Sequence, residues 1–239
     1  MRLDKFLSDM GVGTRNELKK DIKAGLVTVD GSVVRDPGAK VSGDSEVRFR
    51  GLPVAYEEFV YYMLNKPAGV ISASDDPRES TVVDLITGYR RKDLFPVGRL
   101  DRDTEGLLLI TNNGQMAHRL LSPKHHVDKI YYACVSGAVT PDDVIAFSEG
   151  LVLEDGLECL PAELNVLNIN SDNGESVSET EVTIREGKFH QIKRMFHALG
   201  HEVLYLRRLS MGPLELDGSL EPGEFRRLTD EEIKSLEEL

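Results

Sequence analysis

The 239-residue sequence has no tryptophan and only two cysteines, Cys134 and Cys159. Neither cysteine has the Cys-x-x-Cys or Cys/His spacing of a zinc site, so we interpret both as structural thiols and expect no metal. No apolar run is long enough to span a membrane, and the first residues lack the apolar segment of a secretory signal. These absences argue against a disulfide-stabilised secreted scaffold or a membrane partner, and they favour a cytoplasmic location.

Nucleotide-binding motifs are missing as well. Neither the phosphate-binding pattern G-x-x-x-x-G-K-S/T nor the dinucleotide pattern G-x-G-x-x-G occurs, so we expect no cofactor. The hydrophobic content of 40% is sufficient for one good-sized core and a small satellite domain.

The net charge of -12 argues against a nucleic-acid partner, because phosphate binding depends on Lys and Arg. The charge is unevenly distributed, however. Residues 140–184 contain eleven acids and no Lys or Arg, whereas residues 1–50 contain ten bases and eight acids, and residues 185–212 six bases and two acids. The two basic segments therefore remain candidates for binding RNA, although clusters on an ordinary solvated face explain the composition equally well.

The first fifty residues have the pattern of a small helix-helix-hairpin unit. Apolar residues at helical spacing predict a helix over residues 3–10, and Thr14 with Glu17 forms a capping box that begins a second helix. Asp30-Gly31 predicts a type I' hairpin between residues 26–29 and 32–34. We expect a further strand at residues 41–49 and a linker at residues 51–58.

From residue 59 onward, strand and helix patterns alternate without a simple repeat. The expected strands are residues 59–64, 106–111, 130–135, 162–167 and 178–184. The expected helices are residues 115–121, 141–148 and 189–199. Clustered strands with interspersed helices predict an α+β domain on a mixed or antiparallel sheet.

Residues 98–106, Gly-Arg-Leu-Asp-Arg-Asp-Thr-Glu-Gly, place three carboxylates and two arginines directly before a strand buried on both faces. Arg99 and Arg102 flank Asp101 and could keep it ionised. A calcium loop is disfavoured because its twelfth position is Asn112 instead of a bidentate Glu. The spacing does not decide against a glycosidase carboxylate pair, or against a turn in which these residues are purely structural.

This segment resembles the motif that carries the catalytic aspartate of the pseudouridine synthases. Four further segments resemble the same family in chain order: Asn-Lys-Pro-Ala-Gly at residues 65–69, Lys-Ile-Tyr at 129–131, the basic segment 185–195, and Leu206-x-Arg208 with Gly212. The N-terminal residues resemble an S4 RNA-binding domain. The resemblance is to the RsuA-type branch, and it implies a small S4-like domain at residues 1–57 and a larger catalytic domain at residues 58–239.

The resemblance also implies a reaction and roles for individual residues. The N1–C1' bond of a uridine in ribosomal RNA would be broken and a C5–C1' bond formed, which requires no cofactor. Asp101 would be catalytic, Lys188 would be the cation beside it, and Tyr131 would lie against the uracil or move a proton. A structural core tyrosine is the alternative for Tyr131.

Extracting the uridine from folded RNA needs positive groups to contact the phosphates. The predicted RNA contacts are basic or polar residues of the motif segments: Arg2, Lys5, Arg15, Lys19, Lys20, Lys23, Lys66, Arg99, Arg102, Lys129, His190, Gln191, Arg194 and Arg208. Solvated surface lysines and a structural His190 are the alternatives.

Residues 188–195 look more like the small-subunit enzymes, so we expect a specific uridine of 16S rRNA, of the uridine-516 type, as the substrate and a monomeric protein. A 23S rRNA enzyme of the same family is the first alternative. A non-catalytic S4-type RNA-binding or ribosome-assembly protein is the second. A carbohydrate hydrolase would leave the basic segments unexplained.

Overall fold

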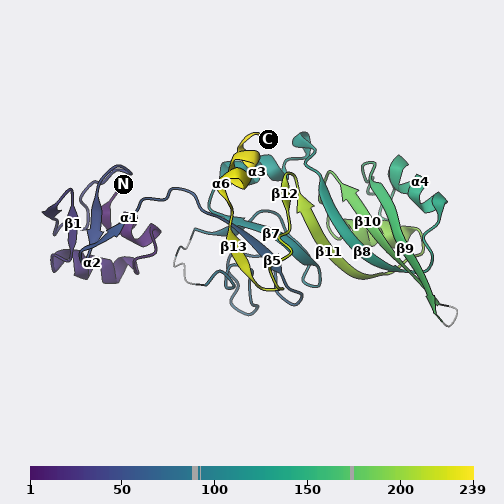
Figure 1. The fold of residues 1–239 in the computed structure, drawn as a ribbon, viewed down its shortest axis with the longest axis horizontal. Helices are drawn as coiled ribbons and strands as arrows, with labels where there is room; N and C mark the ends of the chain where they lie inside the picture. Colours follow the sequence, from purple (N-terminus) through teal and green to yellow (C-terminus); the bar gives the residue numbers. More distant parts are fainter. Residues whose placement is uncertain (88–90, 92, 173–174) are drawn as a thin grey trace. The chain divides into compact units, whose positions relative to one another are not determined.

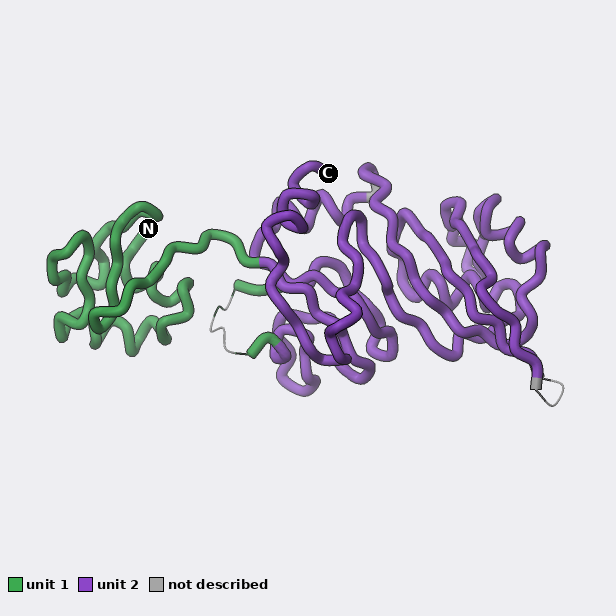
Figure 2. The backbone as a smooth tube through the Cα atoms, viewed as in Figure 1, with its two compact units in different colours: residues 1–60, 86–95 green, residues 61–85, 96–239 purple. Residues whose placement is uncertain are grey.

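The computed structural model describes residues 1–87, 91, 93–172 and 175–239. The chain divides into two compact units, one made of residues 1–60 and 86–95 and the other of residues 61–85 and 96–239 (Figure 2). Among the described residues, no helix has both the length and the apolar character needed to cross a membrane.

The first unit packs two helices on a small sheet (Figure 1). The elements are α1 (Leu3–Asp9), α2 (Arg15–Lys23), β1 (Val27–Val29), β2 (Ser32–Val33), β3 (Val47–Phe49) and β4 (Leu52–Val54), with strand order β2-β1-β3-β4. Its core is formed by fully or almost fully buried apolar residues: Leu3, Phe6, Leu7, Leu18, Ile22, Val27, Val41 and Val47. The expected capping box of Thr14 and Glu17 is confirmed, and so is the hairpin, because Asp30 and Gly31 both have positive φ.

Two expectations for this unit were wrong. The strand expected at residues 41–49 is only β3, because Ser42 and Ser45 bond to each other in a turn. The expected linker at residues 51–58 begins with β4, which pairs antiparallel with β3. The turn between them uses Arg50 at φ 51° and Gly51 at φ 80°. A left-handed arginine is uncommon, so this turn gives a weak sequence signal.

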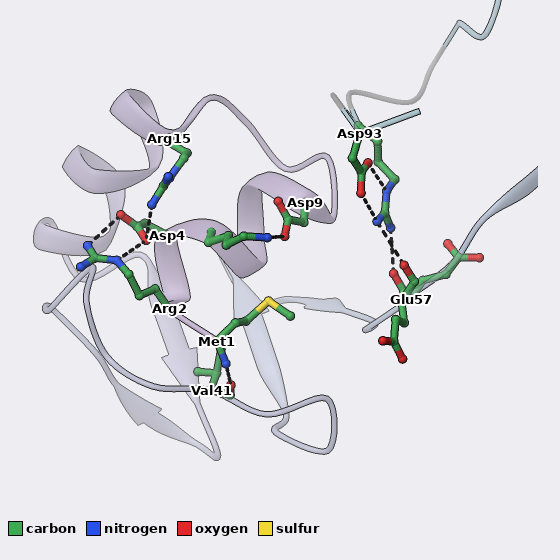
Figure 3. A network of polar contacts seen from close by, with 11 residues as sticks. Met1, Arg2, Asp4, Asp9, Arg15, Val41, Glu57 and Asp93 are labelled. Atoms are coloured by element: carbon green, nitrogen blue, oxygen red, sulfur yellow. Dashed lines mark hydrogen bonds and ion pairs between the residues drawn. The ribbon is translucent and has the colours of Figure 1, made fainter. Parts of the chain in front are cut away.

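Asp4 is fully buried in α1 and joins the chain start to the second helix. Its carboxylate accepts hydrogen bonds from Arg2 at 3.0 Å and from Arg15 at 3.3 Å (Figure 3). The hydrogen bonds from Arg2 and Arg15 outweigh the burial and lower the pKa of Asp4. Two of the basic residues expected to contact RNA are therefore oriented by a buried anion.

The second unit is built on one mixed sheet (Figure 1). Its strand order is β13-β5-β7-β11-β8-β10-β9, and β7 and β11 are the parallel neighbours. The strands are β5 (Tyr61–Lys66), β7 (Glu105–Thr111), β8 (Lys129–Ser136), β9 (Glu163–Asp172), β10 (Glu175–Ile184), β11 (Val203–Met211), β12 (Leu214–Glu215) and β13 (Phe225–Arg227). The short β6 (Phe95–Pro96) precedes β7 in the chain.

The helices of this unit are α3 (Gly114–Leu121), a 3₁₀ turn η1 (Pro123–His125), α4 (Pro141–Glu149), α5 (Gln191–Ala198) and α6 (Asp230–Glu237). Arg119 of α3 bonds to the end of α6, and Phe147 of α4 packs on Phe196 of α5. The α+β class with a mixed sheet is confirmed. The sequence pattern did not predict β11, β13 or α6, and the predicted end of β5, at Leu64, was two residues too early.

We expect Asp4→Asn to destabilise the first unit by about 1–3 kcal/mol, because two arginines lose their buried anion. The lowered pKa means that Asp4 stabilises the fold above its ordinary pKa of 3.8, and that this contribution disappears as the pH falls through the lowered value. Hydrogen exchange of the α1 amides in the full chain measures both effects. Asp9→Asn, which removes only the more exposed Lys5 pair, is the control and should change stability by less than about 0.5 kcal/mol. Equal effects of the two variants would contradict this account.

Candidate active site

The loop of residues 98–106 lies where β7 begins beside β11. Glu105 and Gly106 pair with Arg207 and Arg208 in parallel register. Gly106 has φ +99°, and a Cβ built there would be 2.3 Å from the carbonyl oxygen of Arg208. Only glycine permits this approach of the two strands, so Gly106 fixes one end of the loop against the sheet.

The other side of the loop is held by the end of β5 and the residues that follow it. Lys66 is fully buried, and its ammonium donates hydrogen bonds to the carbonyl oxygens of Pro67, Arg102 and Thr104 at 2.9–3.3 Å. Burial lowers the pKa of Lys66 to about 8. The hydroxyl of Ser72 also bonds to both the amide and the carbonyl of Leu100. These bonds make the loop a fixed part of the domain.

Asp101 faces the first turn of α5. Nζ of Lys193 lies 3.3 Å from Oδ2 of Asp101, and Nε2 of His190 lies 3.5 Å from Oδ1. Lys193 also donates to Asp103 at 2.5 Å, and this contact lowers the pKa of Asp103. Asp101 is 24% exposed at its side chain, so its carboxylate remains accessible from solvent. One ammonium therefore joins two carboxylates of the loop to the helix.

The expected pair of Asp101 with Lys188 is not formed. Nζ of Lys188 lies 2.7 Å from Glu186 and also bonds to the carbonyl oxygen of Glu158. Arg102 pairs with Glu79 at 3.3 Å, and Arg99 makes no ion pair with any residue that the structure describes. The cation beside Asp101, Lys193, thus comes from α5 instead of from the sequence neighbours of Asp101.

A small pocket of about 70 Å³, open to solvent, lies between the loop and α5. Asp101, Arg99, Lys188, His190 and Lys193 contribute polar groups to it. Tyr131, Ile184 and Leu206 contribute buried apolar surface from three neighbouring strands. All three residues expected to be catalytic, Asp101, Tyr131 and Lys188, therefore line one pocket.

Glu186 lies behind the pocket residues Lys188 and Gln191 and contacts both of them. Its carboxylate is 8% exposed at the side chain, pairs with Lys188, and accepts hydrogen bonds from the side chain of Gln191 and the amide of Leu160. The side-chain oxygen of Gln191 in turn accepts from the amide of Lys188. Lys188 is consequently held at its main chain and at its ammonium.

Four of the expected RNA contacts are buried. Lys66, Lys129, Gln191 and Arg208 are at most 6% exposed. Lys129 donates to the carbonyl of Val127, with burial lowering its pKa to about 8, and Arg208 donates to the carbonyl of Leu107. A buried donor of this kind supports the main chain and has no surface to offer a phosphate in this conformation. For Lys66, Lys129 and Arg208 the structure thus shows main-chain support in place of the expected surface position, whereas Gln191 lines the active-site pocket and its contact with RNA stays a prediction.

The remaining expected contacts are at the surface. Arg2, Lys5, Arg15, Lys19, Lys20 and Lys23 are exposed on the first unit, and Arg99 and Arg102 are exposed on the second. Arg194 is partly exposed and pairs with Asp155. Their role in binding RNA stays a prediction.

Sequence reasoning missed Lys193 and Glu186. A signal for Lys193 was present, because residues 190 and 193 are three apart at the start of the predicted helix and share one face. The structure begins α5 at Gln191, since His190 is left-handed at φ 49° and reverses the chain there. No sequence pattern indicates the inward orientation of Glu186.

Within the described part of the chain, no group of three or more His, Cys, Asp or Glu residues is arranged to hold a metal ion. The carboxylates of the calcium-like pattern bind other partners, Asp103 with Lys193 and Glu105 with the hydroxyl of Tyr205 at 2.7 Å. Burial, together with the contact with Glu105, raises the pKa of Tyr205 to about 12.

Known proteins share both parts of this chain. Residues 60–198 match the RNA pseudouridylate synthase family, and residues 1–47 match the S4 domain. An uncharacterized RNA pseudouridine synthase of Bacillus subtilis is 48% identical over 240 residues, which is 100% of this chain and 99% of the relative. A solved structure described as a pseudouridylate synthase is 37% identical with a TM-score of 0.68, covering 99% of both chains.

Small-subunit and large-subunit enzymes are similar to this chain at the same level of sequence identity. The ribosomal small subunit pseudouridine synthase A of Vibrio vulnificus is 41% identical, covering 99% of each chain. The ribosomal large subunit pseudouridine synthase B of Bacillus subtilis is also 41% identical, covering 100% of this chain and 96% of the relative.

We expect Gly106→Ala to destabilise the second unit by about 3 kcal/mol, because the new methyl group would meet the backbone of Arg208 and the positive φ would be strained. Gly114→Ala is the matched control. It adds a methyl group in open space at the start of α3, so its effect should be within about 1 kcal/mol and can be favourable. Urea unfolding of the full chain, followed by circular dichroism, measures both. An unchanged Gly106→Ala transition would contradict the assigned role of this contact.

Proposed function

Because the chain belongs to the RNA pseudouridylate synthase family and carries an S4 domain, we propose that it isomerises a specific uridine of ribosomal RNA and that Asp101 is the catalytic residue. The observation that carries this proposal is the position of Asp101 in an open pocket that Tyr131 also lines, beside Lys193. A carboxylate held in this way can act on a nucleoside that enters from solvent.

The isomerisation breaks the N1–C1' bond of uridine and forms a C5–C1' bond, with no net redox change. Asp101 would supply its carboxylate oxygen either to ribose C1' or to the uracil ring, which assists departure or rotation of the base. Lys193 and His190 would keep the Asp101 carboxylate oriented. Both side chains lie beside that carboxylate, close enough to interact with charge that develops there during the reaction. The final proton removal from C5 needs a base in the same pocket.

Tyr131 is the proposed contact for the uracil. Its side chain is 7% exposed and comes from β8, the strand that pairs with β11 and so lies beside Leu206. Tyr131 also lines the pocket, where its ring and hydroxyl can meet a base that enters. Leu206 and Ile184 would enclose the uracil by apolar contact.

The target nucleotide must leave the RNA stack to reach this pocket, which costs a few kcal/mol. We propose that exposed Arg99 and Arg102 offset this cost near the pocket, and that the exposed bases of α1 and α2 bind the RNA elsewhere by phosphate contacts. With these exposed bases, the protein would bind an anionic RNA although its net charge is -12.

For the substrate we propose 16S rRNA, at a site of the uridine-516 type, because of the segment of residues 188–195. A large-subunit 23S enzyme is the alternative, and the relatives of both kinds keep it open. A non-catalytic RNA-binding or assembly protein is less well supported, because pure binding does not require an accessible carboxylate among phosphate-binding groups. Action in the cytoplasm and as a monomer stays a prediction.

We expect Asp101→Asn to abolish pseudouridine formation while RNA binding persists, because the amide keeps the shape of the side chain and loses its charge. Unmodified 16S and 23S transcripts, incubated with each variant and mapped by mass spectrometry, measure the product and identify the subunit. Asp142→Asn, on the exposed face of α4, is the control and should match the parent. Turnover by Asp101→Asn would contradict the catalytic assignment.

We expect Lys193→Met to lower kcat by about 10- to 100-fold, because it removes the ion pair that holds Asp101, and each factor of ten in rate corresponds to about 1.4 kcal/mol of transition-state stabilisation. Lys188→Met in the same assay separates the two cations. If Lys193 is the partner of Asp101 during the reaction, its loss is the more damaging to kcat. A Lys193→Met enzyme as active as the parent, with Lys188→Met inactive, would mean that Lys188 replaces Lys193 when RNA binds.

A further inference from the structure

Phe189 is the most exposed large hydrophobic residue in the described part of the chain, at 76%. Its ring stacks on the ring of His190, with centroids 3.8 Å apart and an angle of 18° between the planes. His190 is itself a lining residue of the active-site pocket. Two stacked aromatic rings, Phe189 and His190, therefore lie at the mouth of the pocket, and the Phe189 ring is open to solvent.

The backbone conformation at His190 holds these two rings in place. His190 has φ 49° and ψ 33°, a left-handed conformation that is uncommon for a residue with a side chain. This conformation turns the chain into α5, so that Nε2 of His190 reaches Asp101 while Phe189 stays outside. Strained residues of this kind cluster at functional sites, and an exposed ring on a strained turn gives no packing benefit in return.

The charges around the ring indicate what it binds. Lys188 precedes Phe189, Lys193 lies one helical turn further on, and the exposed Arg99 comes from the loop that forms the other wall of the same pocket. An apolar protein surface would have to desolvate these cations, whereas a nucleic acid offers phosphates to the cations and a flat base to the ring. The ring also contacts His190, which lines the pocket that would take the flipped nucleotide.

We propose that Phe189, supported by His190, is a stacking platform for an RNA base that adjoins the flipped uridine. This inference rests on the proposed function, because a nucleotide that leaves the stack deprives its neighbour of a stacking partner. The Phe189 ring replaces that partner. Phe189 acts in substrate binding and positions the strand, and it does not touch the reacting atoms.

The expected kinetic signature is a split between KM and kcat. Base–aromatic stacking is worth enough that removing the ring raises KM between about 5- and 100-fold. Phe189→Leu keeps an apolar side chain and loses the aromatic face, so it should raise KM much more than it lowers kcat. Phe189→Tyr keeps the face and should restore KM to within about 2-fold of the parent.

The absence of tryptophan from the chain permits a direct test. Phe189→Trp introduces a single indole fluorophore at the proposed platform. Ile145→Trp is the matched control, since Ile145 is 53% exposed on α4 and lies outside the pocket lining. Each variant is titrated with unmodified 16S rRNA transcript, and iodide quenching is measured with and without the RNA.

We expect the RNA to quench the indole emission of the Phe189→Trp variant and to protect its fluorophore from iodide. The Ile145→Trp variant should keep both its emission and its iodide accessibility. A Phe189→Trp fluorophore equally accessible to iodide with and without RNA, together with an unchanged KM for Phe189→Leu, would overturn the proposal. Self-association that depends on Phe189 but not on RNA would overturn it too, in favour of a contact between copies of the chain.

The outcome is separable from that of the proposed function. Failure of the parent protein to form pseudouridine on either transcript would refute the function, whereas the fluorescence result depends only on binding. Pseudouridine formation with a normal KM in Phe189→Leu, together with a Phe189→Trp fluorophore that RNA does not protect, would refute the platform and leave the function intact.

Discussion

The ammonium of Lys193 lies between the carboxylates of Asp101 and Asp103 and connects the first turn of α5 to the loop before β7. The pocket depends on this connection, because the loop supplies one wall and the helix supplies the other. Two further constraints prepare the connection. Gly106 brings the loop against β11, and Lys66 binds three carbonyl groups in and beside the loop. The carboxylate thus meets its cation in a preformed geometry, which is the arrangement that electrostatic catalysis requires.

Positive charge has two separate uses in this protein. Lys66, Lys129 and Arg208 are buried and donate to main-chain carbonyl oxygens, so they support the main chain of this unit. Burial lowers the pKa of both lysines to about 8, which shows the electrostatic cost of this use. The second use is the RNA binding that we propose for the exposed bases, which are separate residues. The acidic stretches of the sequence lie in other segments. A basic residue in a motif is therefore not by itself a phosphate contact.

The sequence was most informative where local chemistry decides the structure. The capping box at Thr14, the hairpin at Asp30-Gly31 and the buried strand after the loop could all be predicted, because each depends on residues a few positions apart. The residues gathered in the pocket could be named from motif resemblance. Their partners could not, because the pairing of Lys188 with Glu186 and of Lys193 with Asp101 depends on where α5 begins. That start is set by a left-handed His190, which local propensity disfavours.

The central claim is that the carboxylate of Asp101 meets an extruded uridine while Lys193 holds it in place. A crystal structure of the protein bound to a 16S rRNA fragment containing the modified position tests this claim most directly. The account predicts the target uridine out of its stack, with the Asp101 carboxylate in contact with ribose C1' or the uracil ring and Lys193 still bound to it. A target base that remains stacked in the RNA, or an Asp101 side chain turned away from an occupied pocket, would contradict the account.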